Sequence, residues 1–255
     1  MKNNNPIQKT AMLMLTTLLA FHLSSLTMAA SGDIPDLSGF WGVGRCPDGT
    51  FMGCNELAKD DEKLSSRARA YQAAIDEHAQ PKYDCAPMAI PHLHTDPYNY
   101  RIEQLEDRVN IYYAKDDVVR TIWLIEHDHP EPRVSDFFIQ GHSHGWYEDG
   151  ALVIETDKFT FDPQGLNADF QIPSSTQKQV AERFKREGNN LAFSVTTIDT
   201  LFLLEPWTYE VVSTPVADLG GEWICSVRSS RHSLRFVPPK YKEGPTPDRL
   251  EYLQN

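Results

Sequence analysis

Apolar and polar positions follow two different periods along the chain, and the first period is helical. Between residues 56 and 78 the apolar or small residues recur at threes and fours, as in Leu57, Leu64, Ala68, Tyr71 and Ile75. This spacing puts them on one side of a helix, so the segment is predicted as one N-terminal helix with a single buried stripe. A proline-rich passage over 81–97 then ends helical structure.

From residue 108 onward the pattern has the period of strands. Runs of β-branched and aromatic residues are separated by turn-forming residues such as Asp116-Asp117, Glu148-Asp149-Gly150 and 187–190. The predicted strands cover 108–113, 118–125, 137–140 leading on to 148, 151–156, 180–184, 191–199, 207–212 and 222–227. Eight or so consecutive strands predict a mainly β fold, an antiparallel up-and-down barrel, with a two-sheet sandwich as the alternative. The tail from Pro238, which holds four prolines, is predicted to be extended surface chain.

The first 30 residues have the features of a secretory signal peptide. Lys2 and Lys9 precede a mostly apolar stretch over 11–26, and Ala29 and Ala30 offer a cleavage point. The apolar run is shorter than the roughly 20 residues that span a bilayer, which disfavours the alternative of a membrane anchor. We therefore expect a signal peptide over 1–30, a single β-barrel domain over 31–255, and a periplasmic or secreted protein without an integral membrane segment after cleavage.

The acidic balance of the chain restricts its partners. The formal net charge is −12, and the sequence has no basic run. Such a chain is repelled by phosphate backbones and by anionic lipid surfaces, so nucleic acid is not expected as a partner.

The cysteines indicate disulfides. An even number of cysteines in an exported chain favours pairing, and four cysteines allow three pairings. We favour Cys46 with Cys54 across a short loop, and Cys85 with Cys225, which ties the start of the sheet to its end. A zinc–thiolate site is the alternative, although no C-x-x-C spacing is present.

The most informative chemical feature is a set of three H-x-H pairs. The pairs are His92/His94, His127/His129 and His142/His144. Residues i and i+2 of a strand share one face, so an H-x-H pair on a strand sets two imidazoles side by side. This suits two ligands of one metal ion, or two groups that move protons.

We predict that His142 and His144 point into the barrel, with His94 the nearest third histidine because Pro91 and Pro97 restrict its loop. The predicted acid/base residues are His142, His144, His94, Asp199 and Glu182. Asp199 is expected either to orient a cavity histidine or to cap a turn, and Glu182 to form a structural ion pair or to take part in catalysis. The predicted metal ligands are His92, His94, His142 and His144, with zinc favoured over copper or iron. His127 and His129 are interpreted as plain loop residues.

Gly141-His-Ser-His-Gly145 matches the G-x-S-x-G pattern of a serine-hydrolase nucleophile elbow. That elbow needs a strand, a sharp turn and then a helix, whereas here a Glu-Asp-Gly turn and a β run follow. Partners in the right chain order exist, with Asp199 or Asp218 before His232. A serine hydrolase is therefore kept as an alternative, and Ser143 is predicted not to be a nucleophile.

A longer pattern surrounds the same residues. It begins at Asp36-Leu-Ser-Gly-Phe-Trp41, continues through 141–159 as GHSxGxWExxxLVIxTxxF, and ends with Ala181-Glu-Arg-Phe184, Thr197-Ile-Asp199 and Pro206-Trp207. The chain resembles a large, mostly uncharacterised family of secreted bacterial proteins with this pattern. The resemblance implies a lipocalin-like β-barrel but no settled activity. Tyr147, Ser174-Ser175 and His144 depart from the usual residues of the family.

Two functions follow as expectations. The first is an exported barrel enzyme that acts on a small, largely apolar or aromatic molecule by histidine acid/base chemistry, of the isomerase, lyase or cyclase type. It would work without a cofactor or with a divalent metal, most simply zinc. The second is a periplasmic lipocalin-like binding protein for an apolar ligand or a metal, since barrels host both kinds of function.

Overall fold

The computed structural model describes residues 34–238 except 52, 55, 95, 168, 170 and 222. The predicted signal peptide and the tail beyond Pro238 lie outside the described residues. The described strands are β1 Gly39–Trp41, β2 Tyr100–Gln104, β3 Arg108–Tyr113, β4 Val119–Leu124, β5 His142–Glu148, β6 Ala151–Asp157, β7 Asp162–Asn167, β8 Ile172–Ser174, β9 Gln179–Glu187, β10 Asn190–Ile198 and β11 Trp207–Ser213. The described helices are α1 Ser66–Ala74 and α2 Val227–Ser233, with short 3₁₀ turns at Glu77–Ala79, Pro81–Asp84, His92–His94 and Leu234–Phe236.

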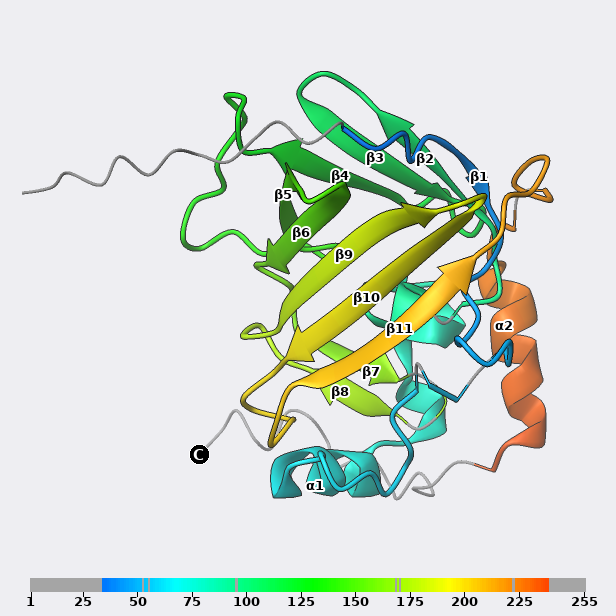
Figure 1. Cartoon of the computed structure of the whole chain (residues 1–255). Coiled ribbons are helices and arrows are strands. Elements are labelled where there is room, and N and C mark those ends of the chain that lie inside the picture. Colours follow the sequence, from blue (N-terminus) through cyan, green and yellow to red (C-terminus); the bar gives the residue numbers. More distant parts are fainter. Residues whose placement is uncertain are drawn as a thin grey trace, which may run out of the picture. The chain divides into compact units, whose positions relative to one another are not determined.

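Nine strands form one curved sheet in the order β1-β2-β3-β4-β5-β6-β9-β10-β11, and β7 and β8 form a separate pair (Figure 1). The chain after β1 returns to the last strand, because the amide of Gly42 donates to the carbonyl of Thr214 at 2.8 Å and that of Arg45 to Val212 at 2.9 Å. The sheet is therefore a nearly closed barrel, and the predicted mainly β, antiparallel-rich fold is confirmed.

One strand pair departs from the up-and-down order. β4 and β5 are parallel, with Ile122 opposite Ser143 and Leu124 opposite Gly145. The other neighbouring strands of the nine are antiparallel. A parallel pair cannot be joined by a tight turn, so residues 125–141 cross over from the end of β4 to the start of β5.

Alternation along the strands fills the barrel. On β10, Leu191, Phe193 and Val195 are buried while the residues between them are half-exposed. Phe193 stacks on Phe184 of β9 with ring centroids 4.6 Å apart. This period-2 burial is what holds each strand in register, because a slip of one residue would expose the whole apolar set.

The predicted turns are confirmed, whereas two of the predicted strands are wrong. Asp149 and Gly150 have positive φ angles of 50° and 67°, as the turn between β5 and β6 requires. The strand predicted over 137–140 is wrong, because Phe138 makes only a single bridge, to Phe159. The strand predicted over 222–227 is also wrong: Trp223 makes one bridge, and α2 begins at Val227.

The predicted helix over 56–78 is present only as α1. Ser65 caps it, and its hydroxyl accepts a hydrogen bond from the amide of Ala68. Leu57 and Leu64 are buried as expected, but they lie in the irregular segment before the helix. Since α2 is a second helix, the prediction of one N-terminal helix is not confirmed.

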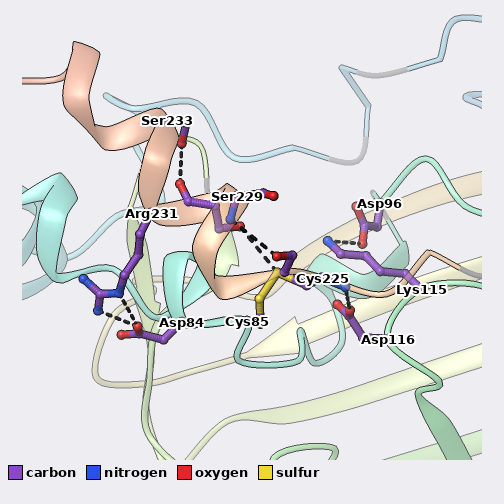
Figure 2. The surroundings of a disulfide bond; sticks show 11 residues. Asp84, Cys85, Asp96, Lys115, Asp116, Cys225, Ser229, Arg231 and Ser233 are labelled. Atoms are coloured by element: carbon purple, nitrogen blue, oxygen red, sulfur yellow. Dashed lines mark hydrogen bonds and ion pairs between the residues drawn. A yellow bond between two sulfur atoms is a disulfide. The ribbon is translucent and has the colours of Figure 1, made fainter.

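Both favoured disulfides are present, Cys46–Cys54 and Cys85–Cys225. Figure 2 shows the second one, which ties the chain before α2 to the 3₁₀ turn at Pro81–Asp84. Around it the amide of Cys225 donates to Asp116 at 2.7 Å, and Arg231 pairs with Asp84. Within the described part of the chain, no helix is long and apolar enough to cross a membrane. The two disulfides indicate an oxidising environment.

Candidate metal centre

His142 and His144 share one face of β5, but that face is the outside of the barrel. Ser143, between them, points inward: its hydroxyl lies 2.8 Å from that of Thr156, which in turn accepts a 3.4 Å bond from the buried Arg120. Alternation then directs the two histidines outward. The prediction that they point into the barrel is wrong, because small residues, Ser143 and Gly145, occupy the inward positions of this strand.

The crossing segment 125–141 covers the outward histidines. It carries His129 and Glu131, and Pro130 and Pro132 flank the glutamate. His129 stacks on Trp123 of β4 with ring centroids 5.8 Å apart and the planes at 18°. The parallel pairing of β4 and β5 therefore brings two loop residues over two strand residues.

Four side chains converge here: His129, Glu131, His142 and His144. One ligand atom from each lies within 4.8 Å of the others. The Glu131 carboxylate is 3.5 Å from His129 Nδ1, 3.5 Å from His144 Nε2 and 4.0 Å from His142 Nε2. We call this group the histidine–glutamate cluster.

Two nitrogens of the cluster lack hydrogen bonds although they are buried. They are Nδ1 of His129 and Nε2 of His142, and neither has a hydrogen-bond partner among the described residues, although the Glu131 carboxylate lies 3.5 and 4.0 Å away. An unpaired buried polar atom costs about 1–3 kcal/mol, so such atoms call for an explanation. Both atoms face the shared centre of the cluster, where a cation would satisfy them.

The donor set fits a divalent transition metal. Three imidazoles and one carboxylate are ligands that zinc, copper and iron accept. Burial, followed by the neighbouring His144, lowers the pKa of His142, so this ring is held in the neutral form that coordinates metals. Glu131 is 67% exposed, which leaves the centre open to solvent on that side.

His94 and Glu182 lie elsewhere, inside the barrel. His94 Nε2 is 2.7 Å from Glu182 Oε1, and Arg120 donates to both oxygens of Glu182 at 3.1 and 2.6 Å. Burial raises the pKa of Glu182, but the Arg120 guanidinium and the bond from His94 outweigh it and lower the pKa to about 2. Glu182 is thus a carboxylate in a buried ion pair.

The other predicted site residues are also apart from the cluster. His92 is half-buried in the turn at His92–His94, where burial lowers its pKa to about 3. Asp199 accepts from the amide and hydroxyl of Ser175 at 2.6 and 2.8 Å and from the amide of Leu201 at 3.2 Å. It caps a turn, which was one of its two predicted roles. Of the four predicted metal ligands, the cluster contains His142 and His144 only.

Sequence reasoning missed His129 and Glu131. The signal that could have found them is the run His127-Asp-His-Pro-Glu-Pro132, in which two prolines restrict a histidine and a glutamate just ahead of the third histidine pair. The position of this run over β5 follows from the parallel pairing of β4 and β5, which the sequence pattern does not indicate.

Neither a family model nor a curated protein matches the chain. The fold and the cluster together define a class: a nearly closed β-barrel with two disulfides and a histidine–glutamate group that could hold a metal ion.

Proposed function

We propose that this protein is an exported metal-binding barrel protein, in which His129, Glu131, His142 and His144 hold one divalent ion, with zinc the first choice. The observation that carries the proposal is the pair of buried imidazole nitrogens that make no hydrogen bond and face a common centre with a carboxylate. If these rings served only to make hydrogen bonds within the protein, their buried nitrogens would have hydrogen-bond partners.

Export to the periplasm, through the signal peptide predicted over 1–30, is part of the proposal. Two disulfides in a chain with no free cysteine among the described residues support it. Membership of the secreted bacterial family with the GHSxGxWExxxLVIxTxxF pattern is likewise proposed, on the motif residues alone.

The four residues of the cluster differ in how firmly the fold holds them. When bound, a divalent ion supplies Lewis acidity. Glu131, because it is largely exposed, is the ligand that can swing aside, whereas His142 and His144 are fixed on β5 and His129 is held by its stack on Trp123. The site thus has three anchored ligands and one movable ligand, the pattern of a centre that admits a further molecule.

A second candidate is the acid/base enzyme of the isomerase, lyase or cyclase type, with its reacting groups inside the barrel. The pair His94–Glu182, joined at 2.7 Å and buried, favours it. Both Glu182 oxygens are already bonded by Arg120, so this pair is better placed for structure than for proton transfer. For this reason we rank it below the metal centre.

Zinc titration of the purified, disulfide-intact protein tests the proposal, followed by calorimetry and by tryptophan fluorescence, to which Trp123 contributes. One ion per chain is expected, with a change in emission because His129 stacks on Trp123. His142→Ala and Glu131→Gln should weaken zinc binding by more than the roughly 10- to 100-fold seen when a residue that only supports a ligand is lost. His127→Ala is the matched control, a histidine two residues from His129 that is outside the cluster.

The outcomes separate clearly when circular dichroism shows that the variants are folded. Zinc binding that survives both cluster substitutions would place the ion elsewhere. Equal losses in the His127→Ala control would show a general effect of the segment. Either result overturns the proposed site.

A further inference from the structure

A hollow on the outer face of the sheet opens beside the histidine–glutamate cluster. Its volume is about 220 Å³, and its lining includes His144, Glu155, Asp157, Gln179, Thr196 and Ile198. His144 therefore belongs to both the cluster and the hollow. A molecule seated in the hollow would lie against a ligand of the proposed ion.

The strand register explains how the hollow forms. His144 is opposite Glu155 on β6, Glu155 is opposite Ala181 on β9, and Ala181 is opposite Thr196 on β10. Side chains opposite each other across antiparallel strands lie about 5 Å apart at Cβ. In this row of facing side chains, Glu155 lies between the ligand His144 and Ala181. The small side chain of Ala181 leaves the space that forms the hollow.

The charged residues that line the hollow are all acidic. Glu155 and Asp157 are its charged residues, and it contains no lysine or arginine. Within the described part of the chain, neither carboxylate takes part in a side-chain hydrogen bond or an ion pair. Asp157 is opposite His142 in the register, as Glu155 is opposite His144, so both carboxylates adjoin the metal ligands.

We infer that this hollow is the ligand subsite of the metal centre and that it takes a small molecule bearing a protonated amine. The inference rests on the proposed metal-binding function. The ammonium group pairs with Glu155 and Asp157, and a donor group at the other end of the molecule reaches the ion beside His144. His144 links the two places, because its ring is one of the four groups of the cluster and also lines the hollow.

The carboxylates, rather than the apolar wall, give the subsite its selectivity. Ile198 and Ala181 offer contact to any small molecule, but two unpaired anions penalise an anionic ligand and stabilise a cationic one. Because Glu155 and Asp157 are exposed, the attraction is moderate and sensitive to salt.

Two imidazole probes, of which one carries an additional ammoniomethyl group, test the inference on zinc-loaded protein. Histamine and 4-methylimidazole both offer an imidazole to the ion, but only histamine carries a primary ammonium. We expect histamine to bind about fivefold more tightly, which corresponds to about 1 kcal/mol. The preference should fall as sodium chloride is raised from about 0.05 to 0.5 M.

The variant Glu155→Gln with Asp157→Asn should keep zinc binding and lose the histamine preference. Glu187→Gln, which removes one charge at the far end of β9, is the control and should keep the preference. Zinc affinity is measured first on each protein. If zinc fails to bind to the wild type, the proposed function fails and the subsite fails with it. If zinc binds but both probes bind equally, or neither binds, or the double variant keeps the preference, the subsite alone is wrong.

Discussion

The buried ion pair between Arg120 and Glu182 should be among the most sensitive points of the fold. The side chains of Arg120 and Glu182 are 1% and 0% exposed, and two hydrogen bonds join them, with a third to Glu182 from His94. Glu182→Gln keeps the shape but removes the charge and offers one acceptor oxygen instead of two. Arg120 is then left as an uncompensated buried cation.

Two independent arguments give the magnitude. Breaking a buried pair by removing one partner costs about 3–5 kcal/mol. The lowering of the Glu182 pKa from 4.5 to about 2 corresponds to about 3 kcal/mol at about 1.4 kcal/mol per pH unit. We therefore expect Glu182→Gln to reduce the free energy of unfolding by about 3 kcal/mol at pH 7.

Urea unfolding followed by circular dichroism measures this loss, with the disulfides intact in every variant. Glu148→Gln is the matched control, because its partner Arg183 lies on the exposed face at 3.5 Å and such pairs contribute about 0–1 kcal/mol. Replacing both buried partners, Arg120→Met with Glu182→Leu, should recover most of the loss.

The pH dependence provides a second check. The pKa of Glu182 is lower in the folded chain than in the unfolded chain, so its contribution is fully present above about pH 4.5 and is lost as the pH falls toward 2. The gap between wild type and Glu182→Gln should therefore narrow below pH 4.5. A Glu182→Gln variant no less stable than Glu148→Gln, or a gap that widens in acid, would refute the reasoning.

Two further predictions concern crosslinks and the serine motif. Replacing both cysteines of Cys85–Cys225 by serine should lower the free energy of unfolding by about 5 kcal/mol, against about 2.5 kcal/mol for Cys46–Cys54, because the bonds close separations of 140 and 8 residues. A urea midpoint of the Cys85–Cys225 variant that is no lower than that of the Cys46–Cys54 variant would contradict this. Ser143→Ala should cost only about 1 kcal/mol, since it removes one buried hydrogen bond. A fluorophosphonate probe should leave the wild-type serine unlabelled, and stoichiometric labelling would revive the hydrolase interpretation.

Strand positions could be predicted where alternation and turn residues agree. β9 and β10 show a clear period of two around Gly188, and the hairpin of β5 and β6 is marked by Asp149-Gly150. β2 and the pair β7–β8 were not predicted, because a proline-rich stretch precedes β2, and two prolines and one glycine interrupt the pair.

The candidate site could be predicted only in part. That His142 and His144 share a face follows from their spacing alone. Which face they share does not, because the alternate positions next to them, Ser143 and Gly145, carry no hydrophobic signal for the core. His129 and Glu131 reach the site through the pairing of β4 with β5, a contact between segments that local pattern cannot specify.

The crossover at residues 125–141 serves the barrel through its length and the proposed metal centre through its sequence. Since β4 and β5 run in the same direction, a connection of a dozen or more residues is obligatory, whatever its sequence. The architecture therefore constrains the length of this segment and leaves most of its composition free. Under the proposed function, substitutions there create, retune or erase the metal centre over evolutionary time while the barrel stays the same, which makes this crossover the natural place to graft new ligands by design.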